Sequence, residues 1–195
     1  DISAEAAKRK CKIYDVLNEK AAAIPPGSEG LLVLEHWQGN RTPWTDPLSR
    51  GVIRGLTLSH TPAHVYRAIM EGVAYGTEVI FRRMEEEGVK ISTLIACGGA
   101  TQSDLWMKIH ADVAGKAITI PEEQQAVTLG SGIAAAVAAG MHPDLCAAAN
   151  AMVRVQRVVE PDMRAHERYK PYVDQYVKTY EGLKDASHEL AAAQA

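Results

Sequence analysis

The chain has 195 residues, of which 47% are hydrophobic and 23% charged, with a formal net charge of −3. This composition is typical of one globular domain with a sizeable core, and it argues against disorder and against a separate second domain. The weakly acidic charge argues against nucleic acid as a partner, no apolar run is long enough for a membrane span, and three widely spaced cysteines are typical of a reducing cytoplasm.

The first part of the chain predicts one helix and two strands. Alternating charged and apolar residues predict an amphipathic helix over 3–23, and short apolar runs predict strands over 30–35 and 51–58. The polar loop between the strands, residues 38–47, is long enough to carry function. The pattern taken alone favours a surface loop held by two prolines and Trp44.

A long helix is predicted over 61–87. Thr61 is placed to cap its first turn, and Pro62 occupies the first helical position, where a missing N–H costs nothing. Gly72 and Gly76 are unfavourable inside a helix, so their spacing predicts close approach of another backbone. Two oppositely charged pairs are assigned to the exposed side: Arg67 with Glu71 and Glu78 with Arg82.

The second half alternates strands and helices. Strands are expected over 93–97 and 117–120, and helices over 103–114, 126–139 and 144–153. A helical region follows Pro161, with a stripe of four tyrosines that we assign to the core, and the tail after Lys184 is expected to fray. The chain is therefore divided into an N-terminal helix and linker over 1–26, a core over 27–153 and a C-terminal helical region over 154–195.

The turn at Gly98 and Gly99 is the strongest candidate for a binding site. Two glycines without Cβ atoms allow positive φ and let a flat base, ribose or phosphate lie against the main chain. The helix that follows presents N–H groups and a partial positive charge. An ordinary strand-to-helix turn would have the same glycines, so the pattern alone leaves both interpretations open.

Other polar residues form no convincing catalytic or metal site. His60 and His64 are four residues apart, but Pro62 lies between them and no glutamate completes a zinc-protease motif. Asp46, Asp104 and Asp112 are general bases by residue type only. We therefore assign no metal ligand and no catalytic residue.

Three segments carry a resemblance to a known family: Gly51 to Glu71, Gly98 to Trp106, and residues 39–43. Residues 27–182, roughly four fifths of the chain, resemble the C-terminal domain of the FGGY carbohydrate kinases, a family that includes glycerol kinase, xylulokinase and ribulokinase. The segment from Gly51 to Glu71 follows the second family signature. The segment Gly98-Gly99-Ala100-x-x-Ser103-x-x-Trp106 is similar to the family's adenosine-binding segment, and residues 39–43 are similar to its Gly-x-Arg-Thr-Pro loop.

The resemblance implies an α/β fold, the ribonuclease-H-like lobe of the actin and hexokinase superfamily, lacking its first strands and ending in a helix. It implies that Gly98, Gly99, Ala100 and Ser103 contact ATP or ADP, and that Mg²⁺ is held mainly by the ATP phosphates and by the N-terminal lobe. The phosphate acceptor would be a sugar or polyol, and the sequence of residues 38–43 favours a pentulose. The phosphate loops and the catalytic base would lie upstream.

Two alternatives to a kinase remain open from the sequence. The first is a non-catalytic nucleotide- or sugar-binding module on the same fold, and a more distant one is a structural interaction domain. The absent upstream strands also predict an unpaired sheet edge near residues 31–35 or 52–58. Such an edge favours pairing with a second copy, and hence a homodimer.

Overall fold

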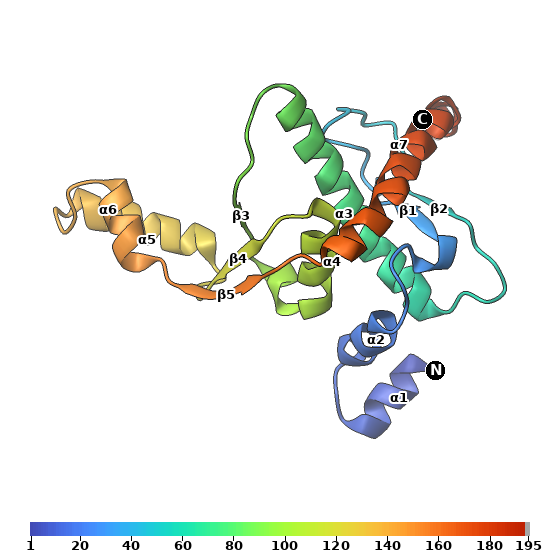
Figure 1. Cartoon of the computed structure of the whole chain (residues 1–195), viewed down its shortest axis with the longest axis horizontal. Helices are drawn as coiled ribbons and strands as arrows, with labels where there is room; N and C mark the ends of the chain where they lie inside the picture. Colours follow the sequence, from blue (N-terminus) through green and yellow to red (C-terminus); the bar gives the residue numbers. More distant parts are fainter. Residues whose placement is uncertain (194–195) are drawn as a thin grey trace.

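The computed structural model describes residues 1–193 as a mixed α/β domain in which two long helices cross near the centre (Figure 1). The long helices are α3 (Pro62–Glu86) and α7 (Met163–Ala192). The other helices are α1 (Ile2–Arg9), α2 (Ile13–Ala22), α4 (Asp104–Ala114), α5 (Ala126–Ala138) and α6 (Leu145–Met152), with short 3-10 turns η1 (Ser28–Gly30) and η2 (Gly99–Gln102). The strands are β1 (Leu32–Leu34), β2 (Val52–Arg54), β3 (Leu94–Ile95), β4 (Ile118–Pro121) and β5 (Val155–Val159).

The strands form two small sheets. In the first, β1 and β2 are antiparallel, with Val33 opposite Ile53. In the second, β4 lies between a parallel β3 and an antiparallel β5, so the order is β3-β4-β5. Strand β5 is absent from the sequence prediction, which placed these residues in a helical region. It pairs with β4 through Val159 opposite Ile118.

The N-terminal helix is broken in two, which corrects the prediction of one helix over 3–23. Lys10 adopts a left-handed conformation, with φ of 54°, and its N–H bonds back to the carbonyls of Ala6 and Ala7 to end α1. The second helix then starts with its own cap, because the Asp15 carboxylate accepts the N–H of Lys12 at 2.9 Å.

Helices α3 and α7 share the main core. The predicted start of α3 is confirmed, with Thr61 as the capping residue and Pro62 in the first turn. The predicted tyrosine stripe of α7 is confirmed as core at Tyr169, Tyr176 and Tyr180, and these side chains pack with residues of β1, α3 and α4. The expected fraying after Lys184 is wrong, since α7 continues to Ala192.

The assignment of Arg67 and Glu71 to the exposed side of α3 is wrong. Both side chains are buried, and Arg67 Nε lies 2.8 Å from a Glu71 carboxylate oxygen. Glu71 also accepts hydrogen bonds from the hydroxyls of Ser28 and Tyr169. Helix α7 and the turn before β1 therefore cover a face that looks solvated from the α3 sequence alone. Glu78 is buried as well, at 9% exposure.

The prediction of close approach by another backbone is confirmed at Gly72, whereas at Gly76 the close atoms belong to the side chains of Glu35 and Tyr176. A Cβ atom on Gly72 would lie 2.5 Å from the Val33 carbonyl oxygen, and one on Gly76 would lie 2.5 Å from a Glu35 carboxylate oxygen. Strand β1 therefore runs directly against the backbone of α3.

Helices α5 and α6 extend away from the two central helices, at the far end of β4 and β5 (Figure 1). The exposed apolar side chains of this part include Val127 of α5, which is 87% exposed, Leu145 of α6, and Met141 in the connection between the two helices. Within residues 1–193, no helix is both long and apolar enough to cross a bilayer.

Candidate functional site

The predicted glycine turn leaves the carboxyl end of β3 and joins it to α4. Gly98 has φ of 87°, a conformation that favours glycine, and its N–H donates to the Gln124 carbonyl at 3.2 Å. Its own carbonyl accepts the hydroxyl of Thr101 at 2.7 Å. The turn is therefore held from both sides before the 3-10 turn η2 begins.

The turn presents bare backbone to its surroundings. Cβ atoms built on Gly98 or Gly99 would meet no other heavy atom within 4 Å, and Gly99 lies outside the positive-φ region. Contacts with neighbouring protein atoms therefore do not require a glycine at either position. Gly98, Gly99, Ala100 and Ser103 lie together on one continuous turn, as the sequence predicts.

Ser103 caps α4, and its hydroxyl already has protein partners. Its oxygen accepts the N–H of Trp106 at 3.3 Å, so one of the helix N–H groups expected to face a ligand is occupied. The same hydroxyl donates to Asn18 Oδ1 at 3.2 Å. Asn18 lies on α2, 85 residues away in the sequence, and sequence analysis gave no signal for it.

Strand β5 contributes a cation to this turn. Arg157 donates to the Thr101 carbonyl at 3.1 Å and forms an ion pair with Asp104 at 2.6 Å. Sequence analysis missed this residue together with its strand. The run of β-branched residues at Val155, Val158 and Val159 is the signal that favours a strand there.

The three aspartates considered as bases all have protein partners. Asp104 pairs with Arg157, and Asp112 accepts from Lys108 and from the N–H of Asp162. Asp46 is 6% exposed and accepts from Tyr180 at 3.0 Å and His188 at 2.8 Å. Burial opposes ionisation of Asp46, but the hydrogen bonds from His188 and Tyr180 outweigh it and lower its pKa. Asp46 is therefore a fixed, ionised acceptor.

The loop that carries Asp46 is anchored to α7 by a buried polar cluster. His36 lies 2.7 Å from the Ser49 hydroxyl and 3.1 Å from the Tyr176 hydroxyl, measured from its two ring nitrogens. Tyr176 also donates to Glu35 at 3.0 Å. Burial raises the pKa of Glu35 to about 7, although the hydrogen bond from Tyr176 acts in the opposite direction. The cluster fixes residues 36–49 against the core.

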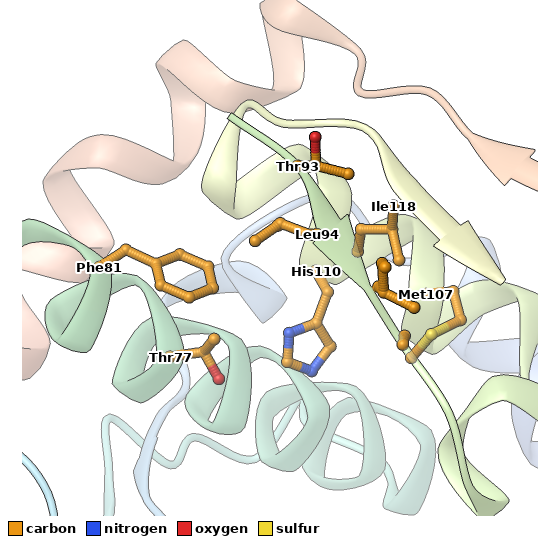
Figure 2. A pocket seen from close by; sticks show the side chains of 9 residues that line it. Thr77, Phe81, Thr93, Leu94, Met107, His110 and Ile118 are labelled. Carbon is orange, nitrogen blue, oxygen red and sulfur yellow. The ribbon is translucent and has the colours of Figure 1, made fainter. Parts of the chain in front are cut away.

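An apolar cavity of about 320 Å³ lies beside β3, between that strand, α3 and α4 (Figure 2). Phe81 and Thr77 of α3 line one side, and Met107 and His110 of α4 line the other. Burial lowers the pKa of His110 to about 4, so its ring is neutral at pH 7. Strand β3 pairs with β4 only, within the described part of the chain, and Ile95 is 72% exposed.

The residues present do not fit a protein-held metal ion. Among residues 1–193, no group of three or more histidine, cysteine, aspartate or glutamate side chains is arranged to hold a metal. His60 and His64 face each other at 5.3 Å between ring centroids, and His64 is paired with Glu29.

Comparisons with known proteins identify the family and the fold. The model of the FGGY family of carbohydrate kinases, C-terminal domain, matches residues 2–139. A ribulokinase of Shouchella clausii is 34% identical over 187 residues, which are 93% of this chain and 33% of the relative. A ribulokinase of Geobacillus thermodenitrificans is 42% identical over 69% of this chain and 24% of its own length.

Solved structures show the same fold. A xylulose kinase of Rhodospirillum rubrum matches with a TM-score of 0.79 at 27% identity, over 90% of this chain and 35% of its own. A xylulose kinase of Lactobacillus acidophilus matches with a TM-score of 0.83 at 24% identity, over 93% of this chain and 37% of its own. The chain thus spans about a third of the length of these relatives, and it belongs to the FGGY family of carbohydrate kinases, within their C-terminal domain.

Proposed function

We propose that this chain is the ATP- and ADP-binding part of a carbohydrate kinase that transfers the γ-phosphate of ATP to a pentulose, with ribulose as the first candidate. The observation that carries the proposal is the open glycine turn after β3, which leaves backbone accessible where a nucleotide would lie. The names of the relatives, ribulokinase and xylulose kinase, favour a pentulose acceptor.

In this proposal the turn binds the nucleoside end of the nucleotide. Gly98, Gly99 and Ala100 supply a flat backbone wall, and Ser103 starts the helix beside it. The hydrogen bonds of Gly98 to Gln124 and of Arg157 to Thr101 hold the wall in place before the ligand arrives. A pre-organised wall of this kind lowers the ordering cost of binding.

Phosphoryl transfer also requires a metal, a base and an acceptor hydroxyl in line with the γ-phosphate. The described residues hold no metal cluster, and the three candidate aspartates are engaged within the protein. We therefore assign these groups, with Mg²⁺ on the ATP phosphates, to an N-terminal lobe of the same polypeptide. The cavity beside β3 and the apolar side chains of α5 and α6 are surfaces that such a lobe would cover.

The test is phosphoryl transfer by the full-length polypeptide that contains this chain. Radiolabelled ATP is supplied with ribulose, xylulose, ribitol or glycerol, and we expect labelled product with a pentulose. Binding of ADP without labelled product from any acceptor would favour a non-catalytic nucleotide-binding module instead. Absence of both ADP binding and transfer would reject the proposal.

A further inference from the structure

Asn18 of α2 stands next to Ser103 and connects three helices. Its Oδ1 accepts the hydroxyl of Tyr66, on α3, at 3.0 Å and the hydroxyl of Ser103, at the start of α4, at 3.2 Å. Tyr66 and Ser103 come from segments far apart in the sequence. Their two donors fix the orientation of the Asn18 carboxamide, because both converge on the same oxygen.

Ser103 and Asn18 differ in the protons that they can still donate to a ligand. A serine hydroxyl carries one proton, and that of Ser103 is already donated to Asn18. Ser103 therefore has no proton left for a ligand while this bond persists. The Asn18 amide nitrogen carries two protons, and it donates neither of them to a protein acceptor within residues 1–193.

The amide nitrogen of Asn18 is also accessible to solvent. The buried side-chain nitrogens that lack a partner in the described part of the chain are those of His60 and Trp106, and Asn18 is not among them. With its oxygen bound to Tyr66 and Ser103, the carboxamide turns its NH₂ group away from both hydroxyls. Asn18 thus offers an oriented, solvent-accessible donor beside the residue where the glycine turn ends.

We propose that the Asn18 amide donates a hydrogen bond to the nucleoside part of the bound nucleotide, and that Tyr66 and Ser103 hold the amide in position for it. This inference rests on the proposed nucleotide site. The acceptors available on a purine nucleoside are its ring nitrogens and ribose oxygens, which lie at the end of the nucleotide opposite the phosphates. Helix α2 would then supply a second side of the site, facing the wall formed by Gly98, Gly99 and Ala100.

The Asn18→Asp variant separates this role from a purely structural one. A carboxylate still accepts the hydroxyls of Tyr66 and Ser103, so the ties between the helices are kept, but the NH₂ donor is lost. In the full-length polypeptide, we expect affinity for adenosine to fall about fivefold, as for loss of one hydrogen bond, with little change in melting temperature. ADP affinity should fall at least as much, measured by the same calorimetric titration.

Two comparisons make the result decisive. Adenosine is uncharged, so a loss of its affinity reports the missing donor, whereas repulsion by the new carboxylate would weaken ADP alone. Asn150→Asp, on the exposed helix α6, makes the same change of charge away from the turn and should leave both affinities unchanged. Unchanged adenosine affinity in Asn18→Asp would overturn this inference while leaving the nucleotide site intact. Failure of the unmodified protein to bind adenosine or ADP would instead reject the proposed function.

Discussion

Gly98 and Gly99 differ in backbone conformation, although neither has a neighbour where its Cβ would be. Gly98 requires positive φ, so a substitution there strains the turn itself. Gly99 lies outside that region, so a side chain there extends into open space. Gly99 is therefore the position at which ligand binding can be blocked without breaking the turn.

We predict that Gly99→Val lowers ADP affinity about tenfold or more, because its branched side chain occupies the space of the nucleotide. The melting temperature should change little. Calorimetric titration with ADP measures the effect, and Gly130→Val on α5, where a Cβ also meets nothing within 4 Å, is the matched control. Equal ADP affinities in Gly99→Val and the unmodified protein would place the nucleotide elsewhere.

Glu35 makes stability depend on pH. Its pKa is about 7 in the folded protein against an ordinary value of 4.5, mainly because of burial. Between these values the folded state binds more protons than the unfolded state. Its contribution to stability is therefore fully present below about pH 4.5 and is lost as the pH rises through about 7.

Replacing Glu35 by glutamine should remove this dependence. We predict that, from pH 5 to pH 8, the unfolding free energy of the unmodified protein falls relative to Glu35→Gln by on the order of 1–3 kcal/mol. Urea unfolding at the two pH values measures the difference. Glu122→Gln, at an exposed position, serves as control. Parallel pH dependences for Glu35→Gln and the unmodified protein would contradict the burial argument.

Helix α3 meets β1 at Gly72, where the backbones are too close for any side chain. We predict that Gly72→Ala destabilises the protein by about 1–3 kcal/mol, since the new Cβ would lie 2.5 Å from the Val33 carbonyl oxygen. Gly182→Ala on α7 has open space around it and should stabilise by up to about 1 kcal/mol through helix propensity. In denaturant unfolding, the changes in unfolding free energy of the two variants should therefore have opposite signs. Changes of the same sign would refute the close contact at Gly72.

Arg67 and Glu71 form a buried pair within α3, and both bond the hydroxyl of Tyr169 on α7. Truncation by Glu71→Ala leaves the Arg67 guanidinium buried without its carboxylate partner, at a cost of about 3–5 kcal/mol. Truncation by Glu86→Ala removes an exposed ion pair with Arg83 and should cost about 0–1 kcal/mol. Thermal unfolding of both variants measures the difference between the two losses of stability. Equal losses would mean that this face of α3 is solvated, as its sequence alone suggests.

Local patterns predicted the elements better than the contacts between them. The capped start of α3, the tyrosine stripe of α7 and the turn at Gly98 each depend on neighbouring residues, and the structure confirms all three as structural features. The burial of Glu71 depends on α7, about a hundred residues later, and Asn18 reaches Ser103 only after folding. Charge spacing and polarity are the same for a solvated pair as for a covered one, so the sequence of α3 could not reveal this burial.

At the scale of the whole molecule, our proposal assigns one wall of the nucleotide site to this chain and the groups that perform the transfer to an N-terminal lobe. We predict that the 195-residue chain alone shows no sugar-dependent ADP release with glycerol, xylulose, ribulose or ribitol. A coupled ADP-release assay measures this, with the full-length polypeptide as positive control. Turnover above background by the chain alone would show that one of its own aspartates acts as base, and Asp46→Asn would then be the first variant to make.

The free edges of the two sheets bear on assembly. Strands β1 and β2 pair only with each other within residues 1–193, and β3 has one neighbour. Pairing of a second copy at the β1–β2 sheet stays a prediction. Sedimentation of the chain alone and of the full-length polypeptide would distinguish a dimer formed at that sheet from an edge covered by the upstream lobe.

The reliance of the first strand on the last helix has a consequence for synthesis on the ribosome. Glu35 and its partner Tyr176 are 141 residues apart, and β1 packs against α7. At about 5–20 residues per second, Glu35 waits roughly 7–30 s for Tyr176 to be translated, and Tyr75 of α3 waits roughly 5–20 s. During this interval Tyr75 and Met70 of α3 lack the cover that α7 gives them. The nascent chain therefore exposes this apolar face of α3 for seconds, which is the kind of surface that cellular chaperones bind.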